Sequence, residues 1–167
     1  GHGNYGIDLD GKGITIRSTD PNDPLVVEQT VIDCDTPGWH RAFCINSEED
    51  PNTVISGLTI CHSDGGEINF GKGTNIGGGA IFCDGASPTI RKCIIRDNTG
   101  CNWGGGICLV RNSNAPIEDC VFDNNGFAWG ANLYIYSSSP RIKRCLLCRG
   151  YCRFGSGAGI CIEDAAG

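Results

Sequence analysis

The chain repeats one stretch of sequence at a nearly constant spacing. Residues 77–93 read GGGAIFCDGASPTIRKC, and closely similar stretches occupy residues 104–120 and 130–145. In each copy an isoleucine stands three residues before the closing cysteine, and these isoleucines are 27 and then 25 residues apart, at Ile90, Ile117 and Ile142. A period in this range is typical of a solenoid, in which each repeat forms one coil and stacks on the previous one.

Short runs of β-forming residues alternate with turn residues. The N-terminal part has such runs at residues 7–9, 14–18, 30–34, 42–46 and 54–60. Three short strands per repeat predict a coil whose strands pair in parallel with the next coil about 4.8 Å away. The 26 glycines gather at the starts of repeats, where sharp corners are needed, so long helices are not expected. We therefore expect an all-β parallel β-helix of about six coils.

The spacing divides one expected domain, residues 1–167, into three parts. N-terminal coils are expected over residues 1–53, and regular repeats of 25 to 27 residues over residues 77–167. Between them, residues 54–76 are expected to form a coil with a long loop, because Ile55 and Ile90 are 35 residues apart. The last copy stops with the chain, and the chain has no methionine. Both observations predict a truncated fragment of a longer protein.

Stacking in register predicts columns of side chains. The isoleucines of the repeat should form an inward column, Ile90, Ile117 and Ile142. The two positions that follow should form surface columns of alternating charge, Arg91, Glu118 and Lys143, then Lys92, Asp119 and Arg144. Opposite charges on neighbouring rungs attract, although each exposed pair contributes only about 0 to 1 kcal/mol. These columns are therefore useful mainly as a sign of register.

The twelve cysteines of the chain are placed as core residues are. Cys93, Cys120 and Cys145 close successive repeats, and other cysteines replace aliphatic residues at equivalent positions. Such cysteines behave as small buried hydrophobes, so we expect a ladder of free thiols rather than disulfides that fix the fold. The candidates for a disulfide in an exported protein are Cys148, Cys152 and Cys101. No metal site is expected from the CxxC pair that begins at Cys145, because too few ligands lie on one side.

Composition argues against several classes of function. With 13 basic and 19 acidic residues, a net charge of -6 and no basic run longer than two residues, the chain is a poor partner for nucleic acid. No apolar run reaches the length of a membrane span. The GGG runs lack a following helix and a Lys-Ser/Thr pair, so neither nucleotide binding nor another cofactor is expected.

Two groups of polar residues are candidates for catalysis. Asp33 and Asp35 flank a cysteine at the end of a predicted strand, where alternation points both to the same side, and paired carboxylates can hydrolyse glycosidic bonds. His62, Asp64 and Glu67 lie in the long loop and have the side chains of a metal site or an acid–base pair. The alternative for the first group is a solvated strand end, and for the second an exposed polar loop.

Aromatic residues mark one edge of the predicted stack. Trp103 and Trp129 precede the glycines of successive repeats, and Phe127 is close to the second. Exposed aromatic columns bind the faces of sugar rings. The alternative is a hydrophobic lid where the turn folds over the core.

Several motifs resemble those of known repeat proteins. The segments GGAI at residues 78–81 and FDNN at residues 122–125 resemble the GGA and FxxN repeats of chlamydial-type polymorphic outer-membrane proteins. The phrases ITIRSTDPNDP at residues 14–24 and VIDC at residues 31–34 are similar to those of secreted bacterial right-handed parallel β-helix proteins of the pectate-lyase-like superfamily. The resemblance implies a right-handed coil, export from the cell, and contact with glycans or surfaces.

Three functions follow from these expectations. The first is a secreted or cell-surface repeat module that binds a polysaccharide or a cell surface. The second is a carbohydrate-active enzyme, either a glycoside hydrolase or a polysaccharide lyase, and the resemblance implies calcium held by acidic side chains for a lyase. The third is a passive spacer. Open edges at the coil ends also predict self-association.

Overall fold

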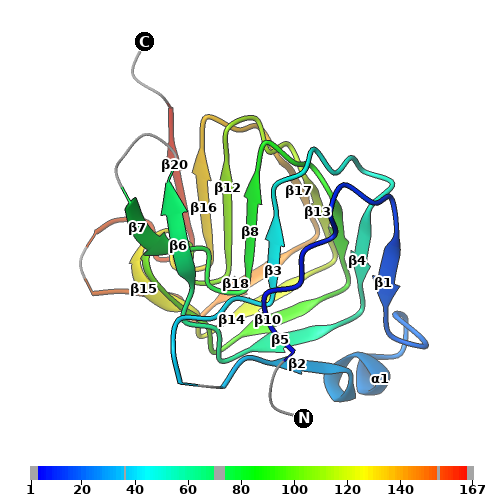
Figure 1. The fold of residues 1–167 in the computed structure, drawn as a ribbon. Helices are drawn as coiled ribbons and strands as arrows, with labels where there is room; N and C mark the ends of the chain where they lie inside the picture. The colour runs from blue at the N-terminus through cyan, green and yellow to red at the C-terminus, as the bar shows by residue number, and fades with distance from the viewer. Residues whose placement is uncertain (1–3, 36, 70–73, 154, 165–167) are drawn as a thin grey trace.

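The structure, a computed structural model, describes residues 4–35, 37–69, 74–153 and 155–164. The chain winds through four sheets of five strands, and the single helix of the described residues lies beside the first coils (Figure 1). The chain thus forms the parallel β-helix predicted from the repeat.

The first two sheets meet at the corner that follows the isoleucine column. Sheet 1 contains β1 (Thr15–Arg17), β4 (Val54–Ser56), β9 (Thr89–Arg91), β13 (Pro116–Glu118) and β17 (Arg141–Lys143). Sheet 2 contains β2 (Val31–Asp33), β5 (Thr59–Cys61), β10 (Ile94–Arg96), β14 (Val121–Asp123) and β18 (Leu146–Cys148).

The other two sheets complete each coil. Sheet 3 contains β6 (Gly66–Asn69), β7 (Thr74–Gly77), β11 (Thr99–Trp103), β15 (Gly126–Trp129) and β19 (Tyr151–Cys152). Sheet 4 contains β3 (Phe43–Ile45), β8 (Ile81–Asp84), β12 (Ile107–Val110), β16 (Leu133–Tyr136) and β20 (Ile160–Glu163). Every pair of neighbouring strands is parallel except β6 and β7.

A regular coil has four strands, so the prediction of three was wrong. The run at residues 54–60 is not one strand, because Gly57 has a φ of 65° and breaks it into β4 and β5. One coil later Lys92 takes the same conformation, with a φ of 53°. A corner of two residues is short enough to be hidden inside one apolar run, and this explains the miscount.

The sheets contain five strands each, where the sequence predicted about six coils. A partial further rung precedes the first strand, because Ile7 forms an isolated parallel bridge with Phe43. The strand expected at residues 7–9 is reduced to this bridge among the described residues.

The interior is filled by columns of aliphatic residues. Ile55, Ile90 and Ile117 pair in register and are fully buried. Parallel pairing about 4.8 Å apart places each isoleucine against the equivalent residue of the next coil. The predicted isoleucine column is therefore confirmed, and Ile142 completes it in the last coil.

Buried asparagines hold one corner of the stack. The Asn98 side chain donates to Asn125 Oδ1 at 3.0 Å, and the Asn125 side chain donates to Ile95 O at 2.8 Å and to Asn132 Oδ1 at 2.9 Å. Both Asn98 and Asn125 are completely buried. Each amide satisfies backbone groups that the corner would otherwise leave unpaired.

The long loop expected between the second and third coils is in fact a β-hairpin. The strands β6 and β7 pair antiparallel and add to the edge of sheet 3. Ile68 of β6 is buried in a cluster with Phe82, Cys108 and Tyr134, which occupy the outer face of sheet 4. The insertion folds because its apolar residue covers apolar residues outside the coil.

The helix α1 (Pro24–Gln29) was not predicted. Asp23 caps its first turn by accepting a hydrogen bond from Leu25 N at 2.9 Å, and a proline at the first helical position fits this capped start. Val27 is buried, and its carbonyl accepts a hydrogen bond from Thr59 of β5 at 2.9 Å. The helix thus covers part of sheet 2.

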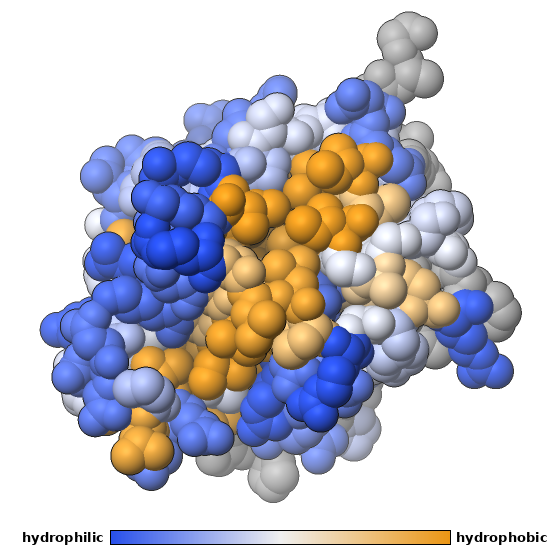
Figure 2. All heavy atoms as spheres, turned by 180° about the vertical axis from the view of Figure 1, so that it is seen from behind, coloured by the Kyte–Doolittle hydropathy of each residue, from blue (hydrophilic) through white to orange (hydrophobic). Residues whose placement is uncertain are grey.

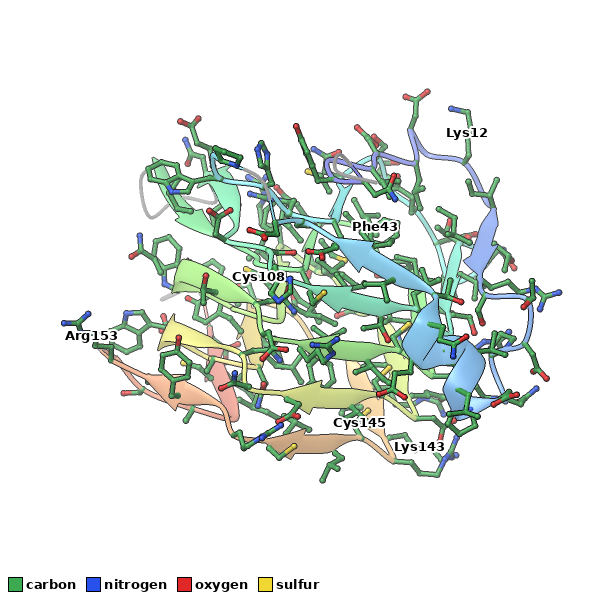
Figure 3. All side chains as sticks on the ribbon, turned by 90° about the horizontal axis from the view of Figure 1, so that it is seen from below. Lys12, Phe43, Cys108, Lys143, Cys145 and Arg153 are labelled. Carbon is green, nitrogen blue, oxygen red and sulfur yellow. The ribbon has the colours of Figure 1, made fainter. Side chains whose placement is uncertain are left out.

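The last coil leaves apolar residues uncovered. Figure 3 shows the coils stacked along one axis, with Lys143 and Cys145 in the last of them. Viewed from behind Figure 1, this end carries an apolar patch (Figure 2), and Leu146 and Ile162 are 58% and 67% exposed. Self-association through this end stays a prediction.

Candidate functional site

Five carboxylates of the regular coils are paired with arginines. Asp119 accepts two hydrogen bonds from Arg144, at 2.5 and 2.8 Å, and Asp123 is paired in the same way with Arg149. These bonds lower the pKa of both aspartates. Equivalent pairs join neighbouring rungs or neighbouring residues elsewhere, namely Asp84 with Arg111, Asp97 with Arg96, and Glu118 with Arg141 and Arg144.

The predicted charge columns are in register, but their pairs are partly diagonal. Glu118 lies between Arg91 and Lys143 in sheet 1, yet it pairs with Arg141, two residues before Lys143. Lys92 donates to Asn22 in the segment before α1. Carboxylates occupied in this way are poor ligands for calcium, because an arginine already neutralises each of them.

The cysteine ladder contains free thiols. The sulfurs of Cys93 and Cys120 are buried, and each lies near a carbonyl of the preceding coil, 3.8 Å from Ile55 O and 3.8 Å from Ile90 O respectively. Cys145 repeats the arrangement in the last coil, 3.6 Å from Ile117 O. Contact with Cys120 lowers the pKa of the Cys145 thiol.

Two of the three candidates for a disulfide, Cys148 and Cys152, are free thiols. Their sulfurs lie against other groups. Cys148 Sγ is 3.4 Å from both Phe122 O and Asp123 Oδ1, and Cys152 Sγ is 3.7 Å from Ser156 O. The side chain of Cys101, the third candidate, lies outside the described residues.

Two separate sequence candidates meet at the end of sheet 2. His62 Nδ1 lies 2.9 Å from Asp33 Oδ1, although the two residues are far apart in the chain. The same carboxylate oxygen accepts a hydrogen bond from the Asp35 amide at 3.1 Å. Asp33 therefore acts as a turn acceptor and as the partner of His62, which is not the arrangement of a carboxylate pair across a cleft.

Cys61 completes a cluster of metal-binding residue types with this pair. The ligand atoms of Asp33, Cys61 and His62 lie within 4.8 Å of one another. Zinc bonds of about 2.0 to 2.3 Å bring tetrahedral ligand atoms to about 3.5 Å, so the group would have to contract to hold the ion. Burial raises the pKa of the Cys61 thiol to about 11, with a further contribution from Asp33. The residue types fit zinc, whereas the spacing fits a hydrogen-bonded histidine and aspartate.

The other residues of the predicted loop have structural contacts. Asp64 Oδ1 accepts a hydrogen bond from His40 N at 2.6 Å, and Asp64 N donates to His40 O at 3.1 Å. Glu67 contributes its carbonyl oxygen to Arg41, and its side chain is exposed. The loop residues therefore fix the segment around His40 instead of forming one catalytic group with His62.

The predicted aromatic edge is present in sheet 3. Trp103 and Trp129 are direct neighbours on adjacent rungs, and Trp129 is 39% exposed. The Trp103 ring lies 6.1 Å from the Tyr134 ring, so it also covers the outer face of sheet 4. Phe127 pairs through its backbone with Gly100, and its side chain lies outside the described residues.

A pocket that the sequence did not predict lies beside the hairpin. Its volume is about 260 Å³, and its walls include Tyr5, Trp39, His40, Arg41, Gly66 and Glu67. These residues come from three separate segments that have no counterpart in the regular repeats. The adjacent Trp39, His40 and Arg41 were the available signal, because such residues after a Pro-Gly turn are suited to binding.

Comparison with known proteins identifies the fold family. A family model described as the right-handed beta helix region matches residues 28–167. No curated protein and no solved structure matches the chain. Among the described residues, no helix has both the length and the apolar character needed to cross a membrane.

Proposed function

The chain belongs to the right-handed β-helix family, and from this premise we propose that it is a secreted or cell-surface repeat module that binds carbohydrate. The binding surface is the aromatic edge of sheet 3, formed by Trp103, Trp129 and Tyr151. Other members of a β-helix family share only the scaffold, so the proposal depends on this edge rather than on the fold.

The register of Trp103 and Trp129 carries the proposal. Because they lie on adjacent rungs, their side chains start about 4.8 Å apart. Tyr151 adds a third ring at 44% exposure, and this ring lies over Gly126, where a Cβ atom would be only 2.5 Å from it. Exposed rings on a rigid sheet suit the apolar faces of sugars, since little side-chain freedom is lost on binding.

The polar groups support binding more than catalysis. Five carboxylates of the regular coils are held by arginines, and the Cys61 thiol is neutral because its pKa is raised. The Asp33 and His62 pair is the observation that favours an enzyme, because a histidine oriented by a carboxylate is a common general base. We therefore keep a hydrolase or lyase as the second candidate.

A glycan array tests the binding proposal. Wild-type protein is expected to bind neutral oligosaccharides, and Trp129→Ala is expected to weaken that binding at least about tenfold, because a stacking surface is lost. Leu25→Ala is the control, since Leu25 is an exposed apolar residue of α1, away from the sheet 3 edge.

Two results would contradict the proposal. Unchanged binding by both Trp103→Ala and Trp129→Ala would show that this edge is not the binding surface. Release of new reducing ends or unsaturated sugars by the wild type, lost in His62→Ala, would instead establish the enzyme.

A further inference from the structure

Arg41 carries a buried charge that the protein itself does not neutralise. Its side chain is only 6% exposed, and its guanidinium lies 4.8 Å from the centre of the Phe82 ring. Nη2 donates to the carbonyl of Glu67 at 3.0 Å, and the guanidinium interacts with the Cys44 thiol, whereas Nη1 makes no hydrogen bond of standard geometry to the described residues. None of the ion pairs in the described part of the chain includes Arg41.

A buried guanidinium without an anion is costly. Charged side chains in protein interiors are normally paired or fully hydrogen-bonded, because desolvation is not otherwise compensated. The regular coils obey this rule with far more exposed arginines: Arg149, whose side chain is 73% exposed, has a carboxylate partner. Arg41, the one arginine among the described residues that is buried, has no carboxylate partner, and it lies in the wall of a pocket.

The surrounding structure holds Arg41 in place. Gly6 N donates to Arg41 O at 2.7 Å, and the two hydrogen bonds between Asp64 and His40 fix the preceding residue. Gly66 leaves room for the side chain, because a Cβ atom there would lie 2.5 Å from Arg41 Nη2. The guanidinium is thus preorganised before any ligand arrives, which lowers the cost of binding.

Besides Arg41, three aromatic side chains line the pocket, together with Cys44, Glu67 and three glycines. The rings of Tyr5 and His40 are stacked, with centroids 3.8 Å apart and planes 25° apart. Trp39 stands at the rim with 60% of its surface exposed. A volume of about 260 Å³ suits one six-membered ring with a substituent rather than a long chain.

From this combination we infer that the pocket binds a carboxylate attached to a six-membered ring. The carboxylate meets the Arg41 guanidinium, and the ring lies between Trp39 and the stacked Tyr5 and His40. Arginine suits this role because its planar fork matches the two oxygens of a carboxylate. The exposed Glu67 carboxylate at the rim leaves the buried charge unneutralised, since only its backbone carbonyl bonds to Arg41.

The pocket is independent of the tryptophan edge but lies in line with it. Gly66, Gly77, Trp103 and Trp129 are successive neighbours across sheet 3. At about 4.8 Å per strand, Gly66 and Trp129 are about 14 Å apart. A ligand in the pocket does not contact Trp129, so loss of one site leaves the other measurable.

Calorimetric titration of the whole chain tests the inference with four probes. Sodium benzoate and sodium glucuronate share a carboxylate on a six-membered ring, glucose has the ring without the charge, and acetate has the charge without the ring. Binding of benzoate or glucuronate, at least about tenfold tighter than glucose and acetate, is expected. Whichever acid binds more tightly shows whether the pocket prefers an aromatic ring or a sugar ring.

Variants locate the binding. Arg41→Met should weaken binding of the acid at least about tenfold, and Arg149→Met, which removes an exposed arginine of the last coil, should leave it unchanged. Gly66→Ala should weaken it as well by displacing the guanidinium. Trp39→Ala provides a variant at an exposed position, should Arg41→Met fail to fold.

The inference fails if neither acid binds, if glucose or acetate binds as tightly as the acids, or if Arg41→Met and Trp39→Ala both bind like the wild type. The Trp129→Ala variant distinguishes the pocket from the proposed carbohydrate-binding edge of sheet 3. This variant should keep full affinity for the acid.

Discussion

Buried polar groups are fully hydrogen-bonded in the regular coils but not in the segment around Arg41, beside the β6–β7 hairpin. In the regular coils Asn125 is completely buried, and both ends of its amide are hydrogen-bonded. Beside the hairpin, Arg41 is almost as deeply buried, yet one of its side-chain nitrogens makes no hydrogen bond to the described residues. A repeat supplies a partner from the next rung, and an irregular segment has no such source. This difference accounts for the incomplete hydrogen bonding of Arg41.

The same contrast explains what the sequence could predict. The columns at Ile90 and Ile117 follow from alignment alone, since each residue has a counterpart one period away. The pocket around Arg41 has no counterpart, because Tyr5, Trp39 and Gly66 come from segments that occur once. Contacts between such segments depend on the folded path of the chain and leave no periodic signal.

Two local features were missed for a different reason. The sequence at Asp23 and Pro24 contains the start of a helix, but a helix of six residues is too short to show an apolar period. The segment of β6 and β7 resembles a loop in sequence because its glycines are spread along it and do not mark a single turn. In both cases the covering of an outer sheet face, by Val27 and by Ile68, stabilises the element.

The largest loss of stability is expected in the isoleucine column of the regular coils. Ile117→Ala should lower the free energy of unfolding by about 2 to 5 kcal/mol, because a fully buried side chain leaves a cavity. Ile142→Ala is the matched control, one rung later in the same column and only half-buried, with an expected loss of about 1 kcal/mol. Urea unfolding followed by circular dichroism measures both. Equal losses would show that burial by the next coil does not determine how much each isoleucine contributes to stability.

A smaller loss is expected when a paired amide is removed. Asn125→Ala should cost about 2 to 3 kcal/mol, since Ile95 O and the Asn98 amide lose a buried partner. Asn114→Ala is the control, because Asn114 is exposed and should cost less than about 1 kcal/mol. The same unfolding experiment applies. A cost for Asn125→Ala no larger than for the control would contradict the structural role of the asparagine ladder.

The most direct measurement compares the unfolding free energy of the wild type and Arg41→Met, with and without the ring carboxylate that binds more tightly. Without ligand, the variant should be within about 1 kcal/mol of the wild type or more stable, because an unpaired buried charge is removed. With ligand at about 100 times the wild-type dissociation constant, the wild type should gain about 2.7 kcal/mol, and a variant that binds at least tenfold more weakly should gain at most about 1.4 kcal/mol. A loss of about 3 kcal/mol or more in the ligand-free variant, together with equal gains for both proteins, would show that Arg41 is a structural residue like Asn125 and contradict the account.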